Sequence, residues 1–290
     1  MKVTGFTIIK NAILFDYPIE EAIRSILPLC DNMVVAVGES SDETRHLISS
    51  IDPKKITILD TQWNKNLTEG GQVLADETNK AFQHISRDAD WCFYIQGDEI
   101  VHEKYHPVIK AAMQQWIENE QVDGLLFDYV HFYGSYDYVG VASRWYKNEI
   151  RIVRNNKQIY SYRDAQGFRK MNNLKLNVKK INASIYHYGW VKKPEVQQLK
   201  RENFGKLWSG ETEGNDTLTI PSGGFDYNNI DALNLFKDTH PAVMQSRIQK
   251  QNWHFSYQLS KNRITLKEIL KKFLLRYLGI NTYYRNYKII

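Results

Sequence analysis

Residues 90–99 read Asp-Trp-Cys-Phe-Tyr-Ile-Gln-Gly-Asp-Glu, an apolar run that ends abruptly in polar residues. The run over 91–95 is typical of a buried strand, and Gln-Gly-Asp-Glu follows it directly at 96–99. Earlier apolar runs, separated by segments of helical period, lie at Val3 to Ile9, Met33 to Val37 and Ile56 to Leu59. This alternation predicts βαβ units, and hence an α/β fold with a mostly parallel central sheet flanked by helices.

The segments between these strands carry helix-start signals. Pro18 is preset for a first helical turn, Ser41 or Asp42 can cap the next helix, and Gly70-Gly71 opens a third. Beyond a further helix that ends near Trp116, strands are predicted at 125–130, 149–153 and 159–162. We expect one α/β domain over residues 1–250 and a basic amphipathic helical tail over 251–290.

Composition narrows the class of protein. The chain has 290 residues, 42% of them hydrophobic and 24% charged, which excludes collagenous, low-complexity and disordered proteins. Two cysteines are too few for a disulfide-stapled fold and favour a reducing compartment. Lys10, Asn11 and Asp16 interrupt any secretory apolar region, and no run approaches the ~18 apolar residues of a membrane span. We expect a cytoplasmic protein.

The positive charge is concentrated at the end of the chain. Residues 261–290 contain eight Lys and Arg against a single Glu, a net charge of +7, so the first 260 residues carry −2 of the total +5. A slightly acidic body does not indicate nucleic-acid binding. We therefore expect no nucleic-acid partner.

The tail has the pattern of an amphipathic helix. Its apolar face holds Leu266, Ile269, Leu270, Phe273, Leu274 and Tyr277, and Lys267, Lys271 and Lys272 lie opposite. Such a helix can lie on an anionic membrane surface through residues 264–290, which would place the protein at the inner face of the plasma membrane. It can equally dock on its own domain or on a second subunit, and the sequence leaves the oligomeric state open.

Polar clusters follow three of the predicted strands. They are Lys10-Asn11, the run 39–42 (Glu-Ser-Ser-Asp) and the run 96–99. In open α/β sheets the carboxyl ends of the strands form the ligand site. The adjacent carboxylates of Asp98 and Glu99 repel each other unless a cation lies between them, and hard oxygen ligands suit Mg²⁺ or Mn²⁺. A solvated turn is the alternative for the acidic pair alone, but the matching clusters favour a ligand site.

In this order of motifs the chain resembles a glycosyltransferase family 2 enzyme with a GT-A fold, of the bacterial surface-polysaccharide type. The resemblance rests on Glu-Ser-Ser-Asp-Glu-Thr at 39–44 and on the run 90–99, and it covers the first hundred residues best. It implies a nucleotide-sugar half over about 1–100 and an acceptor half over about 101–250. It also implies donor-nucleotide contacts from Lys10, Asn11, Glu39, Asp42, Asn79, Gln96 and Asp98, and a divalent metal, Mn²⁺ or Mg²⁺, on Asp98, Glu99 and His187.

The chain departs from the family pattern in both motifs. Val37, Gly38 and Glu39 stand where acids or Gly are usual, and Gln96 occupies the first acidic position of the Asp-x-Asp motif. These departures keep open a non-catalytic nucleotide- or carbohydrate-binding module as the alternative. A nucleotidyltransferase would need a Gly-rich phosphate loop near the first strand, and residues 4–11 do not form one.

The resemblance implies metal-dependent transfer of a sugar from a nucleotide-sugar to a glycan or lipid-linked acceptor, with inversion. Such a reaction needs a carboxylate to take the proton of the acceptor hydroxyl. Asp164, just after a predicted strand, is our candidate for this base, and a salt bridge to Arg163 or Arg169 is the alternative. Asp128, His131 and Asp226 are possible substitutes.

His187 lies between apolar neighbours in the run 185–190 (Ile-Tyr-His-Tyr-Gly-Trp). A lone His in a strand is more often a core residue than a ligand. The resemblance, however, implies a late His on the metal, and Gly189 permits close approach of backbone to a ligand. Lys192 and Lys193 can meet phosphate or form a solvated loop. The aromatic residues from Tyr129 to Tyr146 are interpreted mainly as core, with one or two lining an acceptor groove.

Overall fold

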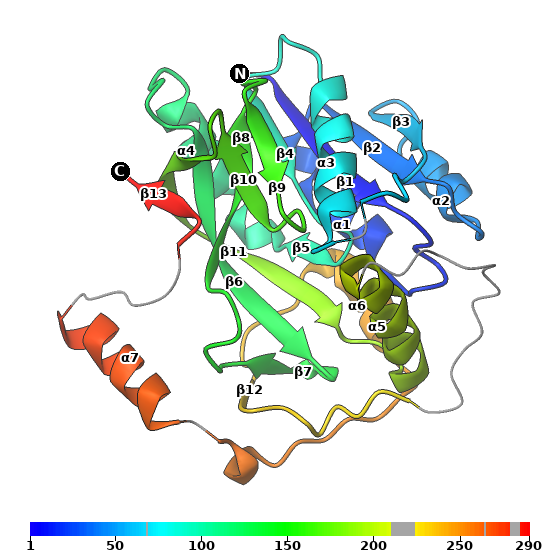
Figure 1. The fold of residues 1–290 in the computed structure, drawn as a ribbon, viewed down its shortest axis with the longest axis vertical. Helices are drawn as coiled ribbons and strands as arrows, with labels where there is room; N and C mark the ends of the chain where they lie inside the picture. The colour runs from blue at the N-terminus through cyan, green and yellow to red at the C-terminus, as the bar shows by residue number, and fades with distance from the viewer. Residues whose placement is uncertain (68, 210–223, 264, 279–284) are drawn as a thin grey trace.

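The computed structural model describes residues 1–67, 69–209, 224–263, 265–278 and 285–290. One sheet runs through this part of the chain in the order β3-β2-β1-β4-β8-β6-β11-β10-β9. Helices lie on both sides of the sheet (Figure 1). The expected α/β class is therefore confirmed.

The first half of the sheet is parallel. Strands β3, β2, β1 and β4 pair side by side in the same direction, with helices between them along the chain. The elements are β1 (Val3–Ile9), α1 (Ile19–Ile26), β2 (Asn32–Gly38), α2 (Thr44–Ile51), β3 (Ile56–Thr61), α3 (Gln72–His84), β4 (Trp91–Tyr94) and α4 (His106–Trp116). All eight were expected, because each carries an uninterrupted apolar run or a helical period.

Alternating side chains of the inner strands divide the core into two layers. Val35 of β2 packs with Ile23 of α1 and Ile109 of α4 on one face of the sheet. On the other face Phe6 of β1 packs with Phe82 of α3. Both faces of a parallel sheet must be covered, which explains the unbroken apolar runs.

The second half of the sheet is mixed. Strand β8 runs antiparallel to both β4 and β6, and the long β11 is parallel to β6 but antiparallel to β10 and β5. These strands are β5 (Glu99–Val101), β6 (Gly124–Tyr133), β7 (Ser135–Gly140), β8 (Asn148–Arg154), β9 (Ile159–Tyr162), β10 (Gly167–Lys170), β11 (Leu174–Trp190) and β12 (Leu233–Leu235). The three-residue strands β5 and β12 are too short to show a period in sequence, and β7 and β10 were not anticipated either.

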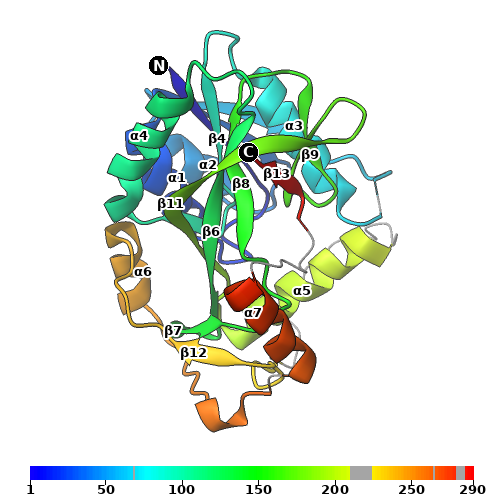
Figure 2. The ribbon, with the colours of Figure 1, turned by 90° about the vertical axis from the view of Figure 1, so that its left-hand side faces the viewer.

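The end of the chain differs from the expected helical tail. After α5 (Pro194–Ser209), α6 (Gln245–Gln249) and α7 (Leu266–Leu278), the chain returns to the sheet as β13 (Tyr287–Ile289), which pairs with β11. Figure 2 shows β13 next to the sheet, and Figure 1 shows α7 standing away from the rest of the molecule. The last strand therefore belongs to the body of the fold. Short 3-10 helices complete the described part: η1 (Leu27–Leu29), η2 (Glu103–Tyr105), η3 (Ala242–Met244) and η4 (Leu259–Lys261).

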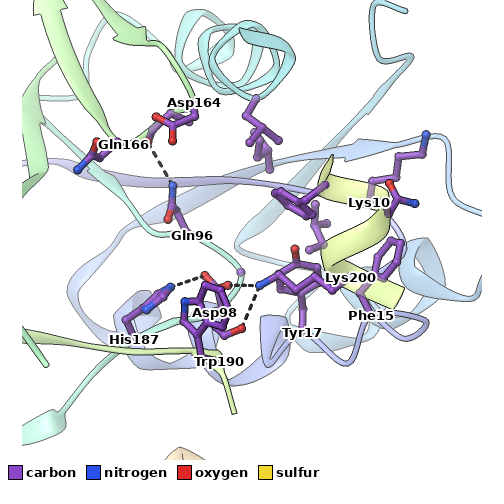
Figure 3. A pocket seen from close by; sticks show the side chains of 18 of the residues that line it. Lys10, Phe15, Tyr17, Gln96, Asp98, Asp164, Gln166, His187, Trp190 and Lys200 are labelled. Carbon is purple, nitrogen blue, oxygen red and sulfur yellow. Dashed lines mark hydrogen bonds and ion pairs between the residues drawn. The ribbon is translucent and has the colours of Figure 1, made fainter. Parts of the chain in front are cut away.

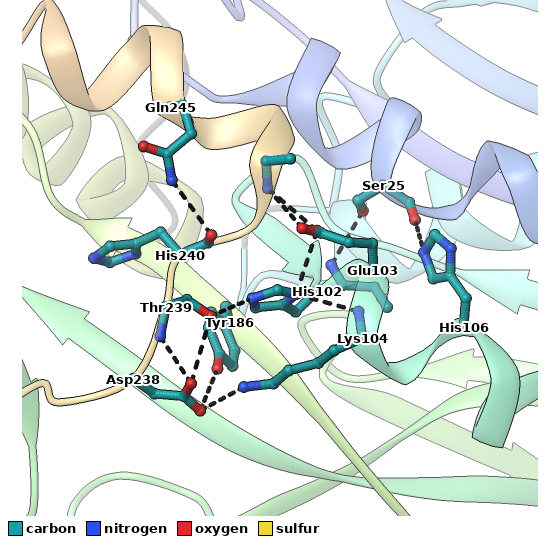
Figure 4. Close-up of polar contacts among 12 residues, drawn as sticks. Ser25, His102, Glu103, Lys104, His106, Tyr186, Asp238, Thr239, His240 and Gln245 are labelled. Carbon is teal, nitrogen blue, oxygen red and sulfur yellow. Dashed lines mark hydrogen bonds and ion pairs between the residues drawn. The ribbon is translucent and has the colours of Figure 1, made fainter.

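A polar cluster attaches the segment before α6 to the edge of the sheet (Figure 4). His102 Nε2 lies 2.9 Å from Thr239 Oγ1, and Lys104 forms an ion pair with Asp238. The hydroxyl of Tyr186 on β11 also donates to Asp238, at 3.4 Å. The chain up to η3 is therefore held to the body by contacts from β11, from η2 and from His102, the residue between β5 and η2.

Candidate active site

A cavity of about 610 Å³ opens at the carboxyl ends of β1 and β4, between the end of β11, helix α5 and the turn that joins β9 to β10. Figure 3 shows its polar side chains converging from these elements. Six of the residues expected from sequence line it: Lys10, Asn11, Gln96, Asp98, Asp164 and His187. Tertiary structure therefore gathers into one place residues up to 177 positions apart in the chain.

Three expected nucleotide contacts do not line this cavity. Asp42 accepts from the backbone N–H groups of Leu14 and Thr44, so it ties the β1 loop to the start of α2. Asn79 exchanges two hydrogen bonds with the backbone of Ser161 and joins α3 to β9. Glu39 is exposed at the end of β2. The structure thus gives Asp42 and Asn79 local structural contacts.

Glu99 also lies outside the cavity lining, in contrast to the expected metal ligand. Its carboxylate is fully buried, and both oxygens accept from the Arg151 guanidinium at 2.7 Å. Tyr129 Oη donates to the same carboxylate at 2.8 Å. The charge of Glu99 is compensated by Arg151 instead of a metal, so we do not retain Glu99 as a metal ligand.

Asp98 is the buried carboxylate of the cavity, and a lysine and a histidine lie close to it. Lys200 Nζ on α5 lies 3.0 Å from its Oδ2, and His187 Nε2 lies 3.7 Å from its Oδ1. Burial alone would raise the pKa of this carboxyl, but the positive charge of Lys200, the largest opposing effect, lowers it well below its usual range. Asp98 is therefore ionised at neutral pH.

The hydrogen bonds of His131 determine which nitrogen of His187 carries the proton. His131 Nε2 lies 2.7 Å from the carbonyl oxygen of Tyr146, which only accepts, so this nitrogen donates. Burial, together with the nearby His187, lowers the pKa of His131 to about 3, so the ring is neutral and its Nδ1 accepts. The partner at 3.1 Å, His187 Nδ1, must then donate. In its neutral form His187 therefore directs the lone pair of Nε2 toward Asp98.

This arrangement fits a divalent cation. The 3.7 Å between Asp98 Oδ1 and His187 Nε2 can be spanned by one ion, since ligand distances of Mg²⁺ are about 2.0–2.1 Å. Gly189 preserves the space between them, because a Cβ there would come 2.6 Å from His187 Nε2 and 2.7 Å from Asp98 Oδ2. No group of three or more His, Cys, Asp or Glu that could hold a metal exists within the described ranges, so Asp98 and His187 form an incomplete ligand set.

Asp164 lies on the turn between β9 and β10, across Gln96 from Asp98 (Figure 3). The flanking residues Arg163 and Ala165 adopt positive φ angles of 57° and 61°. Gln96 Nε2 donates to the Ala165 carbonyl at 3.2 Å, which links the turn to the Asp98 loop. Neither expected salt bridge of Asp164 is present among the placed residues, because Arg163 and Arg169 both lie over the Tyr162 ring.

The possible substitutes for Asp164 lie elsewhere or have other contacts. Asp128 pairs with Lys180 at 2.8 Å, and Asp226 accepts from its neighbour Asn228. His131 orients His187, as shown above. Of these candidate bases, only Asp164 lines the cavity.

Three residues in or near the cavity were not predicted from sequence: Lys200, Trp63 and Arg151. Lys200 comes from α5, whose spacing alone gives no sign of a site. Trp63, in the loop after β3, lines the cavity with Lys10 Nζ over its ring at 5.4 Å, and its buried Nε1 has no hydrogen-bond partner in the described part of the chain. Arg151 did give a signal, since one charge within the apolar run 150–153 requires a buried partner.

The two lysines after β11 differ in environment. Lys192 is fully buried, donates to the Asp16 carbonyl and lies over the Tyr17 ring at 4.8 Å. Burial, with the nearby Lys200, lowers its pKa to about 7. Lys193 is exposed. Lys192 therefore ties the segment after β11 to Asp16 and to Tyr17, which lines the cavity.

The aromatic cluster is mostly core, as interpreted from sequence. Phe132 and Tyr136 belong to the main core, and Tyr133 packs with Tyr227 and Leu233 in a smaller cluster. Tyr146 and Trp190 also line the cavity, so they contribute to its aromatic surface. Trp145 stacks on His131 at 5.0 Å and holds that ring against His187.

Comparison with known proteins gives remote likenesses only. No family model matches the chain, and no curated protein matches it. A structure of Staphylococcus aureus TarS is similar with 17% identity and a TM-score of 0.39, over 68% of this chain and 38% of that one. Glucosyl-3-phosphoglycerate synthase from Mycobacterium tuberculosis, solved with Mn²⁺, UDP and glucosyl-3-phosphoglycerate, has 17% identity and a TM-score of 0.31, over 46% of this chain and 45% of that one.

A third similar structure belongs to another class. 4-Diphosphocytidyl-2C-methyl-D-erythritol synthase from Anaerococcus prevotii has 9% identity and a TM-score of 0.32, over 53% of this chain and 70% of that one. The match to the TarS structure named above covers 38% of that chain, so the present chain spans well under half of its length. Because identities are below 25% and TM-scores below 0.5, these likenesses alone determine neither the fold nor the activity of this chain.

The helices of the described part of the chain are too short or too polar to span a membrane.

Proposed function

We propose that this chain is a GT-A-type glycosyltransferase, related to family 2, that transfers a sugar from a nucleotide-sugar to a glycan or lipid-linked acceptor with inversion. The observation that carries the proposal is the arrangement of one cavity. It has Asp98 and His187 on one side, Asp164 on the other, and basic residues from the β1 loop and α5 in its lining. This arrangement provides for both the leaving group and the attacking hydroxyl.

The donor would lie along the ends of β1 and β4. Lys10 and Lys200 supply positive charge for the diphosphate, and Trp63 offers an indole face beside Lys10 on which a nucleobase can stack. Asp98 and His187 would hold the divalent metal, with diphosphate oxygens completing the ligand set. When bound, a Mn²⁺ or Mg²⁺ ion neutralises the charge of the departing diphosphate.

Asp164 acts on the acceptor. As the new bond from the acceptor oxygen to the anomeric carbon forms, the bond from that carbon to the diphosphate oxygen breaks, and its electron pair leaves with the diphosphate. Asp164 accepts the proton of the acceptor hydroxyl, a contribution of about 10²–10⁴-fold in rate. Gln96 and Arg151 hold the turn through the carbonyls of Ala165 and Gln166, which keeps this carboxylate in place.

Helix α7 supports a position at the inner face of the plasma membrane. Its described apolar residues are solvent-facing, with Leu266 84% and Phe273 51% exposed, so they do not dock on the domain. The surrounding 30 residues carry a net charge of +7. An anionic membrane surface matches both the apolar face and the charge, and it would bring a lipid-linked acceptor to the cavity.

The experiment that tests the donor site is a thermal-shift panel of UDP, GDP, dTDP and CMP, each with and without Mn²⁺. A ligand at about 100 times its Kd adds about 2.7 kcal/mol to the free energy of unfolding. We expect stabilisation by one of these nucleotides, increased by Mn²⁺ and lost in Asp98→Ala. Absence of any nucleotide effect would contradict the proposal, and binding without sugar transfer would favour a non-catalytic module.

A further inference from the structure

Lys200 is an unexpected cation in the centre of the cavity. Its Nζ donates to Asp98 Oδ2 at 3.0 Å and to the carbonyl oxygen of Gly189 at 3.2 Å (Figure 3). The ammonium also lies over the Tyr17 ring at 4.6 Å. Helix α5 therefore delivers a positive charge to the carboxylate that we assign to the metal.

The surroundings of Lys200 differ from those of a closed structural ion pair. An ammonium has three N–H donors, and the described residues accept two of them. The side chain is 13% exposed and lines the cavity, whereas the Arg151–Glu99 pair is fully buried and lies outside it. Lys200 thus retains hydrogen-bonding capacity on the cavity side.

Charge balance makes Lys200 and a divalent cation competitors for Asp98. Asp98 is the only carboxylate within salt-bridge distance of Lys200 among the described residues. The Lys200 ammonium already compensates the negative charge of Asp98. A divalent cation bound to Asp98 would therefore be repelled by Lys200. A diphosphate brings two or three negative charges, which is enough for the metal and the ammonium to be held together.

Resting on the glycosyltransferase proposal, we infer that Lys200 is a binding and catalytic residue for the donor diphosphate, and that it pairs with Asp98 only until the donor arrives. With donor present, the ammonium turns to a phosphate oxygen and frees Asp98 for the metal. Metal therefore enters together with the diphosphate and not before it. As the sugar–phosphate bond breaks, Lys200 stabilises the negative charge that grows on the leaving phosphate.

The test measures metal and diphosphate binding separately, by thermal shift and by the electron paramagnetic resonance signal of free Mn²⁺. Wild type, Lys200→Met and Lys200→Arg are each titrated with MnCl₂ alone, inorganic pyrophosphate alone, and both together. Lys110→Met is the matched control, because Lys110 is exposed on α4 and does not line the cavity.

For wild type we expect weak binding of Mn²⁺ alone and at least tenfold tighter Mn²⁺ binding with pyrophosphate. Lys200→Met should bind Mn²⁺ alone at least tenfold more tightly than wild type and pyrophosphate alone at least tenfold more weakly. Lys200→Arg, which retains the charge, should keep Mn²⁺ binding dependent on pyrophosphate, and Lys110→Met should match wild type.

Two other results would contradict the inference, and they distinguish a failure of the Lys200 role from a failure of the proposed function. If Lys200→Met folds with a wild-type melting temperature and binds both probes as wild type does, the role of Lys200 is overturned while the donor site stands. If wild type binds neither pyrophosphate with Mn²⁺ nor any nucleotide of the panel, the proposed function fails and the inference fails with it. Melting temperatures without ligand show whether each variant is folded.

Discussion

Arg151 holds both carboxylate oxygens of Glu99 at 2.7 Å in the centre of the sheet, and neither side chain is exposed to solvent. The same guanidinium donates to the carbonyl of Gln166 at 2.9 Å, next to the turn that carries Asp164. Because Glu99 directly follows Asp98, one arginine fixes the loop on each side of the cavity. The spacing between the two proposed reactive carboxylates thus depends on a pair that takes no part in the reaction.

Removal of one member of this pair should be strongly destabilising. Arg151→Met leaves the Glu99 carboxylate buried without its partner, which typically costs about 3–5 kcal/mol. The double variant Arg151→Met/Glu99→Gln removes the charge as well and should be more stable than the single variant. Urea unfolding of wild type, both single variants and the double variant measures the coupling. Additive losses would show that the two side chains act independently.

Asp164→Asn tests the proposed base. The substitution keeps the shape of the side chain but cannot accept a proton, so we expect kcat for release of nucleoside diphosphate to fall at least ~10²-fold. The affinity for the nucleotide identified in the panel should change little, because Asp164 is assigned to the acceptor. Asp128→Asn, at a carboxylate outside the cavity, serves as the control. Wild-type turnover of Asp164→Asn would eliminate this residue as the base.

Gly189→Ala tests the space between the proposed metal ligands. The new Cβ would lie 2.7 Å from Asp98 Oδ2 and 2.6 Å from His187 Nε2, closer than carbon contacts allow. We expect loss of the Mn²⁺-dependent part of the nucleotide thermal shift. Gly205→Ala on α5 is a matched control, since its Cβ would come within 4 Å of no packing neighbour in the described part of the chain. An unchanged Mn²⁺ effect in Gly189→Ala would place the metal elsewhere.

Glu149 makes stability depend on pH. Its Oε1 accepts from Gln166, and its buried Oε2 has no hydrogen-bond partner among the residues described. Burial, opposed by the charge of Arg151, raises its pKa from 4.5 to about 8. The stabilising contribution of the protonated form is complete below the unfolded pKa near 4.5 and is lost as the pH rises through about 8.

The free energy of unfolding should therefore fall by up to about 1.4 kcal/mol per pH unit from this group between pH 5 and 8. In Glu149→Gln, which is neutral at every pH, that decline should be absent. Melting temperatures of both proteins over pH 5–9 measure the difference. Parallel curves would show that Glu149 does not change its protonation on folding.

Helix α7 gives a prediction about membranes. Ile269 and Phe273 are 52% and 51% exposed, and replacing both by Glu should abolish binding to anionic vesicles in a sedimentation assay. Leu174→Glu, at a position 52% exposed on β11, controls for added charge and should bind like wild type. Deletion of 264–290 is unsuitable because it also removes β13 from the sheet. Undiminished vesicle binding by the double Glu variant would exclude α7 as the docking face.

The amino-acid sequence by itself determined the α/β class and the parallel half of the sheet. Apolar runs such as 91–95 and the periods of α1 to α4 are local properties, and a parallel sheet covered on both faces requires them. Sequence also placed Asp98 and Asp164 among the candidates, because each follows a predicted strand, and the family resemblance added His187. Short strands such as β5 and β13 leave no period, so their pairing with β11 could not be predicted.

Tertiary structure alone decided which polar residues share the cavity. Asp98 and Glu99 are adjacent in sequence, yet one faces the cavity and the other faces Arg151, because successive side chains leave the chain in different directions. Lys200 reaches Asp98 across 102 residues, and its helix carries no motif for that contact. The pattern of apolar and polar residues along the chain predicts burial and secondary structure. Charge pairing between distant segments depends on how those segments pack in the fold.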